Sequence, residues 1–265
     1  TFDTWFSSGQ WTLLSLGYPD LKDVSAYHPT DIMETGHDLI FKWVPRMVIF
    51  ALYLKSEIPF KTVYLHGLVN DAHGKKMSKS KGNVISPIDI LDKFGTDALR
   101  MALIVGNTPG SDLALSEDKI KGYKHFANKI WNASRFVLSN IEDLKLDSNV
   151  ELAEADQKLL AELNGITKEV TNDINSFRYH LAAEKIYHYF WHTFADKIIE
   201  EAKPRLAKPA GNKDKESIQY TLYNILKTNL KLLHPFMPFI TEELWSIIPR
   251  VSTDNDLLLV ESWPN

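Results

Sequence analysis

Four lysines fall within the seven residues 75–81, Lys-Lys-Met-Ser-Lys-Ser-Lys, and the segments on either side limit the fold. A near-continuous run of β-type residues precedes them at 62–69, and Ser86 with Pro87 after them is typical of a helix start. An apolar run without polar alternation predicts a strand buried on both faces of a parallel sheet. A basic loop at the carboxyl end of such a strand either binds an anion, with polyphosphate as the natural candidate, or is a solvated turn.

The first 116 residues alternate between strand-like and helix-like patterns. We expect strands at 31–35 and 62–69, and helices at 38–53, 86–94 and 96–105, the first of them kinked at Pro45. Residues 1–17 are rich in aromatic and hydroxyl side chains and show neither a helical nor a strand period. Their tryptophans are either packing anchors or a pocket wall. The alternation predicts one half of a doubly wound, Rossmann-type nucleotide-binding fold.

From Ser116 onward the pattern is helical throughout. Apolar stripes at helical spacing recur in five stretches, 120–141, 159–177, 181–202, 218–232 and, more briefly, 241–248. Amphipathic helices without strands predict a bundle. The expected fold class is therefore α/β plus all-α, with one domain at 1–116, a helical domain at 117–265 and a loose loop at 208–215.

The composition excludes several other classes of protein. The chain has 265 residues, a formal net charge of −4, 44% hydrophobic residues and no cysteine, so neither disulfides nor thiolate metal sites are available. No apolar run approaches the length of a membrane span. These features lead us to expect a cytoplasmic protein without membrane contact.

One segment is locally basic. Six Lys or Arg residues and two acids lie between positions 119 and 145. On a helix such a stripe is either a solvated face or a nucleic-acid contact, and the sequence leaves both open.

Six separated blocks resemble one family, the valyl-tRNA synthetases, which are class I aminoacyl-tRNA synthetases. Lys76-Met77-Ser78-Lys79-Ser80 is identical to the lysine-loop signature of class I. Residues 3–11 are similar to the segment after the family's editing insertion, and residues 35–43 to its nucleoside-facing segment. Residues 66–69 are similar to the lead into the lysine loop. Residues 126–133 and 234–245 are similar to the anticodon-binding domain. Relatives specific for isoleucine tend to carry an acid where Ser7 stands, which favours valine. An isoleucyl- or leucyl-tRNA synthetase and a non-catalytic tRNA-binding paralogue remain the alternatives.

The chain departs from the family pattern in several respects, which include the absence of the editing insertion and of the C-terminal coiled coil. It has no His-x-Gly-His motif, and Pro45 and Ser111 occupy positions where relatives usually carry other residues, Arg in the second case. The first residue is Thr1. By resemblance, the chain corresponds to the part of the enzyme from the end of the editing insertion through the anticodon-binding domain. Its expected partners include the N-terminal half of the catalytic domain and the editing domain, and alone it is not expected to aminoacylate.

The resemblance also implies a reaction. The carboxylate of valine attacks the α-phosphorus of ATP, pyrophosphate leaves, and the valyl group passes to tRNA(Val). Such a transfer needs positioning and positive charge more than covalent help from the protein. The implied cofactors are ATP and Mg²⁺ bound with it, without a metal site built from protein side chains.

The same resemblance assigns residues to roles. Lys76 and Lys79 are the catalytic pair, and Trp5 and Ile40 wall the valine pocket. The ATP-binding set is Gly36, Asp38, His66, Gly67, Met77, Ser78 and Lys79, and the tRNA-binding set is Lys121, Lys124, Lys129 and Arg135. Taken by itself, Asp38 is equally an acid at the start of a helix, and the tryptophans of the helical half are more typical of a core than of RNA stacking.

Overall fold

The computed structural model describes residues 1–146 and 150–264. The backbone packs into two compact units, which we describe separately. The first unit contains residues 1–76 and 107–114, and the second contains 77–106 and 115–265. The segment 77–106 thus packs with the helices, although the sequence analysis assigns it to the first domain. The domain division at 116/117 stays a prediction.

The first unit is built on two parallel strands. Strands β1 (Thr30–Gly36) and β2 (Phe60–His66) pair in register from Thr30 opposite Phe60 to Gly36 opposite His66. A shorter parallel pair joins β3 (Val69–Asn70) to β4 (Leu113–Ala114). The predicted strand at 62–69 is therefore interrupted: β2 ends at His66, before a buried glycine, and the chain pairs again at β3.

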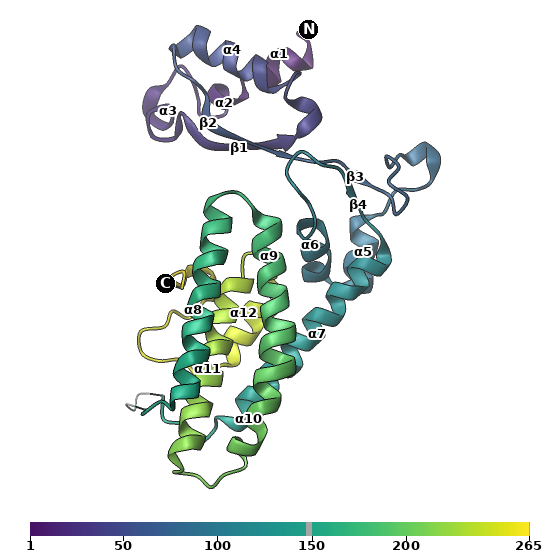
Figure 1. Cartoon of the computed structure of the whole chain (residues 1–265). Helices are drawn as coiled ribbons and strands as arrows, with labels where there is room; N and C mark the ends of the chain where they lie inside the picture. The colour runs from purple at the N-terminus through teal and green to yellow at the C-terminus, as the bar shows by residue number, and fades with distance from the viewer. Residues whose placement is uncertain (147–149, 265) are drawn as a thin grey trace. The chain divides into compact units, whose positions relative to one another are not determined.

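Helices cover one face of this sheet. Helix α4 (Val44–Lys55) packs against β1 and β2 through Val44, Met47 and Phe60, and Figure 1 shows it beside α1. The predicted helix at 38–53 begins later than expected, because a three-residue turn, η1 (His37–Leu39), precedes it. Pro45 lies in the first turn of α4, so the predicted kink is wrong; proline is tolerated there because that position has no helical partner for its nitrogen.

The opening segment is helical although it shows no helical period. It forms α1 (Thr4–Gly9) and α2 (Trp11–Leu14), followed by α3 (Leu21–Tyr27). Asp3 and Asp20 accept backbone N–H groups at the starts of α1 and α3, as N-cap residues do. Helices α1 and α2 pack against α4, so they need no regular apolar stripe.

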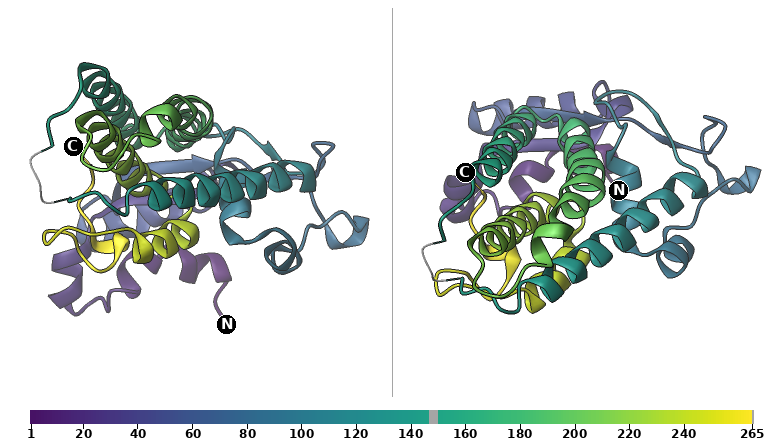
Figure 2. Two further views of the ribbon diagram at one scale, coloured as in Figure 1. Left: turned by 90° about the horizontal axis from the view of Figure 1, so that it is seen from below. Right: turned by 60° about the horizontal axis from the view of Figure 1, so that its bottom comes forward.

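The second unit begins with the end of the lysine stretch and three helices. A single turn, η2 (Lys79–Lys81), leads to α5 (Pro87–Phe94), α6 (Thr96–Ile104) and α7 (Glu117–Asn140), and Figure 2 shows α7 as one continuous helix. Ser86 and Ser116 cap α5 and α7 as predicted. Ile90, Ala98 and Ile120 are buried together, which packs the three helices around one small core.

The remaining helices form the expected bundle with α7 (Figures 1 and 2). They are α8 (Glu154–Asn175), α9 (Tyr179–His188), a π-helical stretch η3 (Tyr189–Ile198), α10 (Ile199–Leu206), α11 (Lys213–Leu233), α12 (Pro238–Ile247) and a final turn η4 (Leu258–Val260). Within residues 120–146 and 150–205 the structure contains no strand, in agreement with the prediction.

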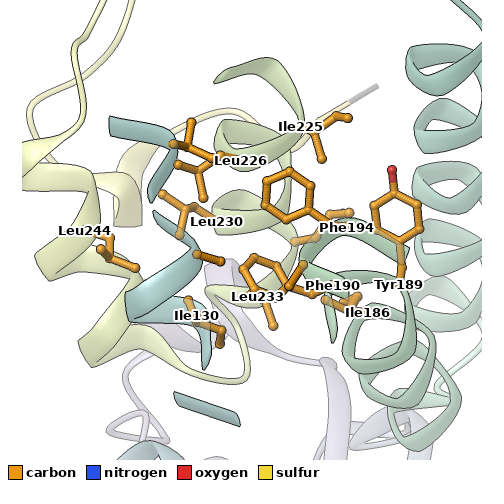
Figure 3. Close-up of a cluster of buried hydrophobic side chains, with 14 of the residues drawn as sticks. Ile130, Ile186, Tyr189, Phe190, Phe194, Ile225, Leu226, Leu230, Leu233 and Leu244 are labelled. Atoms are coloured by element: carbon orange, nitrogen blue, oxygen red, sulfur yellow. The ribbon is translucent and has the colours of Figure 1, made fainter. Parts of the chain in front are cut away.

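The bundle core contains the predicted stripes. Figure 3 shows side chains from α7, α9, η3, α11 and α12 directed toward one another, among them Ile130, Phe190, Phe194, Leu230 and Leu244. The predicted start of the last helix at Thr241 is wrong. Helix α12 begins at Pro238, and Thr241 is buried with its hydroxyl donating to the Met237 carbonyl. None of the helices among the described residues is long and apolar enough to span a membrane.

Candidate nucleotide site and RNA-facing helix

The carboxyl ends of β1 and β2 bring the predicted nucleotide residues together. Gly36 and His66 are direct partners in the parallel register, so the segments after both strands leave the sheet at one edge. The ring of His66 lies between two oxygen atoms: its Nδ1 donates to the Gly67 carbonyl at 2.8 Å, and its Nε2 lies 3.2 Å from a carboxylate oxygen of Glu34. These two contacts orient the imidazole at the carboxyl end of β2.

Both predicted glycines lie close to other residues, but only at Gly67 does neighbouring backbone exclude a side chain. A Cβ at Gly36 would lie 2.9 Å from the Oδ1 atom of Asp38 and 3.7 Å from the His66 ring. A Cβ at Gly67 would lie 1.7 Å from the Ser111 carbonyl oxygen, a distance that no side chain can occupy. The structure therefore places Gly36, Asp38 and His66 side by side, and it packs Gly67 against the returning segment 107–114.

The lysine stretch starts as a tight turn. Asp71 accepts backbone N–H groups of His73 and Lys75, both at 2.9 Å, and Lys76 pairs with Asn70 across the turn. These bonds hold the exposed Lys76 at the end of a short hairpin that follows β3.

The second part of the stretch is anchored on the helices. Met77 packs on the core of α5, α6 and α7, and the Ser78 amide donates to the Asn83 side chain at 2.9 Å. The Ser78 and Ser80 hydroxyls are 3.2 Å apart. The side chain of Lys79 lies outside what the structure describes, so its predicted role is not tested by geometry.

The comparisons with known proteins agree along the whole chain. Residues 1–116 match the family described as tRNA synthetases class I (I, L, M and V), and residues 156–265 match the anticodon-binding domain of tRNA ligase. The valine–tRNA ligases of Clostridium acetobutylicum and Thermotoga maritima are 44% and 42% identical to it over 99% of its length. The chain belongs to the valyl-tRNA synthetase family. It spans about 30% of the length of these curated relatives.

Solved structures show the class I synthetase fold as well. The methionyl-tRNA synthetase of Mycobacterium tuberculosis, in complex with methionyl-adenylate, superposes with a TM-score of 0.76 at 25% identity over 90% of this chain and 48% of its own. A LeuRS from Agrobacterium radiobacter K84, in a ternary complex with tRNA and LeuAMS, gives 0.75 at 23% identity over 100% of this chain and 33% of its own. At that identity the second likeness concerns the fold alone.

The two residues that the resemblance assigns to the valine pocket, Trp5 and Ile40, lie in different environments. Trp5 is half-buried on α1, and the guanidinium of Arg46 on α4 lies 4.6 Å from the centre of its ring. Ile40 is half-buried at the end of η1, immediately after the nucleotide segment. Trp43, which directly precedes α4, donates its ring N–H to the Ser8 carbonyl at 2.9 Å.

The four residues of α7 that the resemblance predicts to bind tRNA differ in their contacts. Lys121 and Arg135 are exposed, whereas Lys124 donates to the Lys93 carbonyl at 2.9 Å and Lys129 pairs with Asp196 at 2.6 Å. Phe126 is fully buried, so it is a core residue and not a stacking surface for RNA. Trp245 is also fully buried, as expected for a core tryptophan, and donates to the Asn255 carbonyl.

Asp112 links the segments that follow β1 and β2, and it was not predicted from the sequence. Asp112 accepts the backbone N–H of Leu68 at 2.8 Å, and its carboxylate lies 2.9 Å from Nε2 of His37. The hydrogen bond from His37 is the main cause that holds the pKa of Asp112 below its usual range, with the Leu68 amide second. His37 lies 75 positions away in the chain, so no local pattern could have revealed the pair.

Proposed function

We propose that this chain takes part in the ATP-dependent activation of valine and in the transfer of valine to tRNA(Val). The observation that carries the proposal is the identity of 42–44% with valine–tRNA ligases over 99% of the chain. The matched region spans both the lysine signature and the strand-end residues described above.

The ATP site of this proposal lies at the strand ends. Gly36 lets the backbone approach the nucleoside, the Asp38 carboxylate beside Gly36 accepts from ribose hydroxyls, and His66 with Gly67 borders the pocket. Asp38 lies in the first turn of η1, so the helix-start interpretation remains its alternative. Its carboxylate lies beside the buried Gly36, which is the register partner of His66 at the strand ends, and this position supports the nucleotide role.

The chemical step depends on positive charge where the phosphates gain negative charge. In this proposal Lys76 and Lys79 supply that charge, while the backbone at Met77 and Ser78 borders the adenine side. Mg²⁺ arrives bound to the phosphates as part of the substrate. Trp5 and Ile40 wall the apolar pocket that receives the side chain of valine.

The helical part of the proposal concerns tRNA. Lys121, Lys124, Lys129 and Arg135 lie along α7, and basic side chains of this kind bind RNA through phosphates. We retain the boundary near residue 117 as the division between catalytic and anticodon-binding parts. We place the activity in the cytoplasm, where aminoacyl-tRNA is consumed.

Valine-dependent pyrophosphate exchange tests the proposal most directly. The complete gene product that carries this chain is incubated with ATP, labelled pyrophosphate and valine, isoleucine or leucine, and then with tRNA. We expect exchange that is fastest with valine and charging of tRNA(Val). Preference for isoleucine or leucine would assign the chain to a sister enzyme, and tRNA binding without any exchange would assign it to a non-catalytic paralogue.

A further inference from the structure

The Asp112 carboxylate connects the segments that follow both parallel strands. Its Oδ1 atom accepts from the Leu68 amide at 2.8 Å and lies 2.9 Å from Nε2 of His37, and its Oδ2 accepts from the Asn70 side chain at 3.3 Å. His37 follows β1, whereas Leu68 and Asn70 follow β2. One side chain therefore holds together two loops that carry the proposed nucleotide residues.

The backbone around Asp112 is held independently of its carboxylate. The Gly110 amide donates to the Leu65 carbonyl and the Leu113 amide to the Leu68 carbonyl, both at 2.9 Å. The β3–β4 pairing and the close packing at Gly67 add to these bonds. A change confined to the Asp112 side chain should therefore leave segment 107–114 docked, so its effect can be measured in a folded protein.

The geometry also fixes the orientation of His37. A carboxylate accepts the proton on Nε2, and in a neutral imidazole Nδ1 is then an acceptor. The His37 side chain is 34% exposed, and the residue lies between Gly36 and Asp38 in the chain. An oriented, accessible ring in this place is suited to a polar contact with the ribose or the base.

We propose that Asp112 is a positioning residue of the nucleotide site, which acts by orienting His37 and by holding the turn at Leu68 and Asn70. The assignment rests on the proposed function. It predicts that the Asp112 carboxylate contributes to ATP binding without touching the reacting atoms.

The test compares Asp112→Asn and Asp112→Glu in the complete gene product, with pyrophosphate exchange measured at varied ATP and varied valine. Asparagine keeps the shape but removes the charge, so charge-assisted bonds to His37 and Leu68 are weakened. We expect the KM for ATP to rise about tenfold in Asp112→Asn, with kcat and the KM for valine changed by less than about threefold. Asp112→Glu, which keeps a carboxylate on a longer stem, should recover part of the loss.

Asp31→Asn is the matched control, because Asp31 is a highly exposed carboxylate in the same unit, paired with the exposed Lys61. It should leave all three kinetic constants unchanged. His37→Gln, alone and with Asp112→Asn, completes a double-mutant cycle, and the two losses should be less than additive if Asp112 acts through His37.

An unchanged KM for ATP in Asp112→Asn would overturn the inference. A lower melting temperature with the KM values for ATP and valine raised together would also overturn it, because it would show a structural role only. If the unmodified protein shows no exchange with any amino acid, the proposed function itself fails. If the unmodified protein is active and Asp112→Asn has the same kinetic constants, only the inference about Asp112 fails.

Discussion

The carboxylate of Asp97 on α6 caps helix α12 by accepting the backbone N–H of Ile240 at 2.8 Å. Helix α12 has no side-chain cap of its own, and the Phe239 amide also points at Asp97, at 3.4 Å. Arg100, one turn further along α6, donates to the carbonyls of Pro235 and Phe236 at the preceding turn. Helix α6 thereby holds the turn between α11 and α12 in place, although α6 is far from that turn in the sequence.

Loss of this cap should destabilise the helical unit. We expect Asp97→Ala to lower the free energy of unfolding by about 1–3 kcal/mol, because two helix-start amides lose their acceptor at a buried position. Asp97→Asn retains one acceptor oxygen and should cost less. Urea unfolding followed by circular dichroism measures both, and Asp92→Ala on the exposed face of α5 is the control, with a change below about 0.5 kcal/mol. Equal stability of Asp97→Ala and the control would contradict the capping role.

The same residue makes the stability depend on pH with an unusual sign for an aspartate. Burial raises the pKa of Asp97 above its ordinary value of 3.8, and the amides of Ile240 and Phe239 oppose that rise only in part. The native state therefore binds the proton more tightly than the unfolded chain, so the contribution of Asp97 to stability falls as pH rises through the native pKa. The difference in unfolding free energy between the unmodified protein and Asp97→Asn should decrease from near pH 4 upward and then level off. A difference that grows with pH would show that the hydrogen bonds outweigh burial.

Lys79→Ala should affect catalysis more than binding. The charge that Lys79 is proposed to meet develops on the phosphates in the transition state, so we expect the rate of valyl-adenylate formation to fall about 100-fold or more, with a much smaller loss in ATP binding. Single-turnover kinetics in the complete gene product separate the two quantities. Lys81→Ala, just past the signature, is the control and should cost far less. Equal losses in rate and in ATP affinity would reduce Lys79 to a residue that holds the nucleotide.

Trp5→Ala tests the valine pocket. If Trp5 walls the pocket, its removal opens space beside the methyl groups of valine, so isoleucine should gain relative to valine by about 0.8 kcal/mol, the value of one buried CH₂. Pyrophosphate exchange with both amino acids measures the ratio, and Trp11→Ala on the neighbouring helix α2 should leave it unchanged. A lower melting temperature with an unaltered valine to isoleucine ratio would move Trp5 from the pocket into the packing against Arg46.

The contacts on α7 divide its basic residues into two groups for tRNA binding. Lys121→Ala and Arg135→Ala should each weaken binding and lower the slope of log K against log salt by about 1, because both side chains are exposed. Replacing Lys129 together with Asp196 by alanine leaves the net charge unchanged and should have a smaller effect, since the pair already neutralises itself at 2.6 Å. Filter binding at several salt concentrations distinguishes these variants. An equal loss in the double variant would show that Lys129 leaves Asp196 to meet a phosphate.

The sequence was sufficient wherever a local signal decides the structure. The caps at Ser86 and Ser116, the apolar stripes of the bundle and the break after Ile104 depend on residues close together in the chain. The start of α12 could not be predicted, because its cap comes from Asp97, more than 140 positions earlier. The helices at 4–14 were missed for a similar reason, since contact with α4 replaces the periodic stripe.

The candidate site divides in the same way. The glycines and the lysine signature are visible as a motif, and the nearby backbone of Ser111 explains why glycine is needed at 67. The Asp112–His37 pair was not visible, because it forms only after the segment 107–114 returns to the strand ends. Side-chain partnerships across such distances follow from the fold and not from spacing.

The chain crosses from one packing unit to the other between Lys76 and Met77, inside the five-residue signature. The signature is therefore divided between two separately packed bodies. Its first lysine is carried by the body that contains the strand ends, and its last four residues are carried by the body that contains α5 to α7.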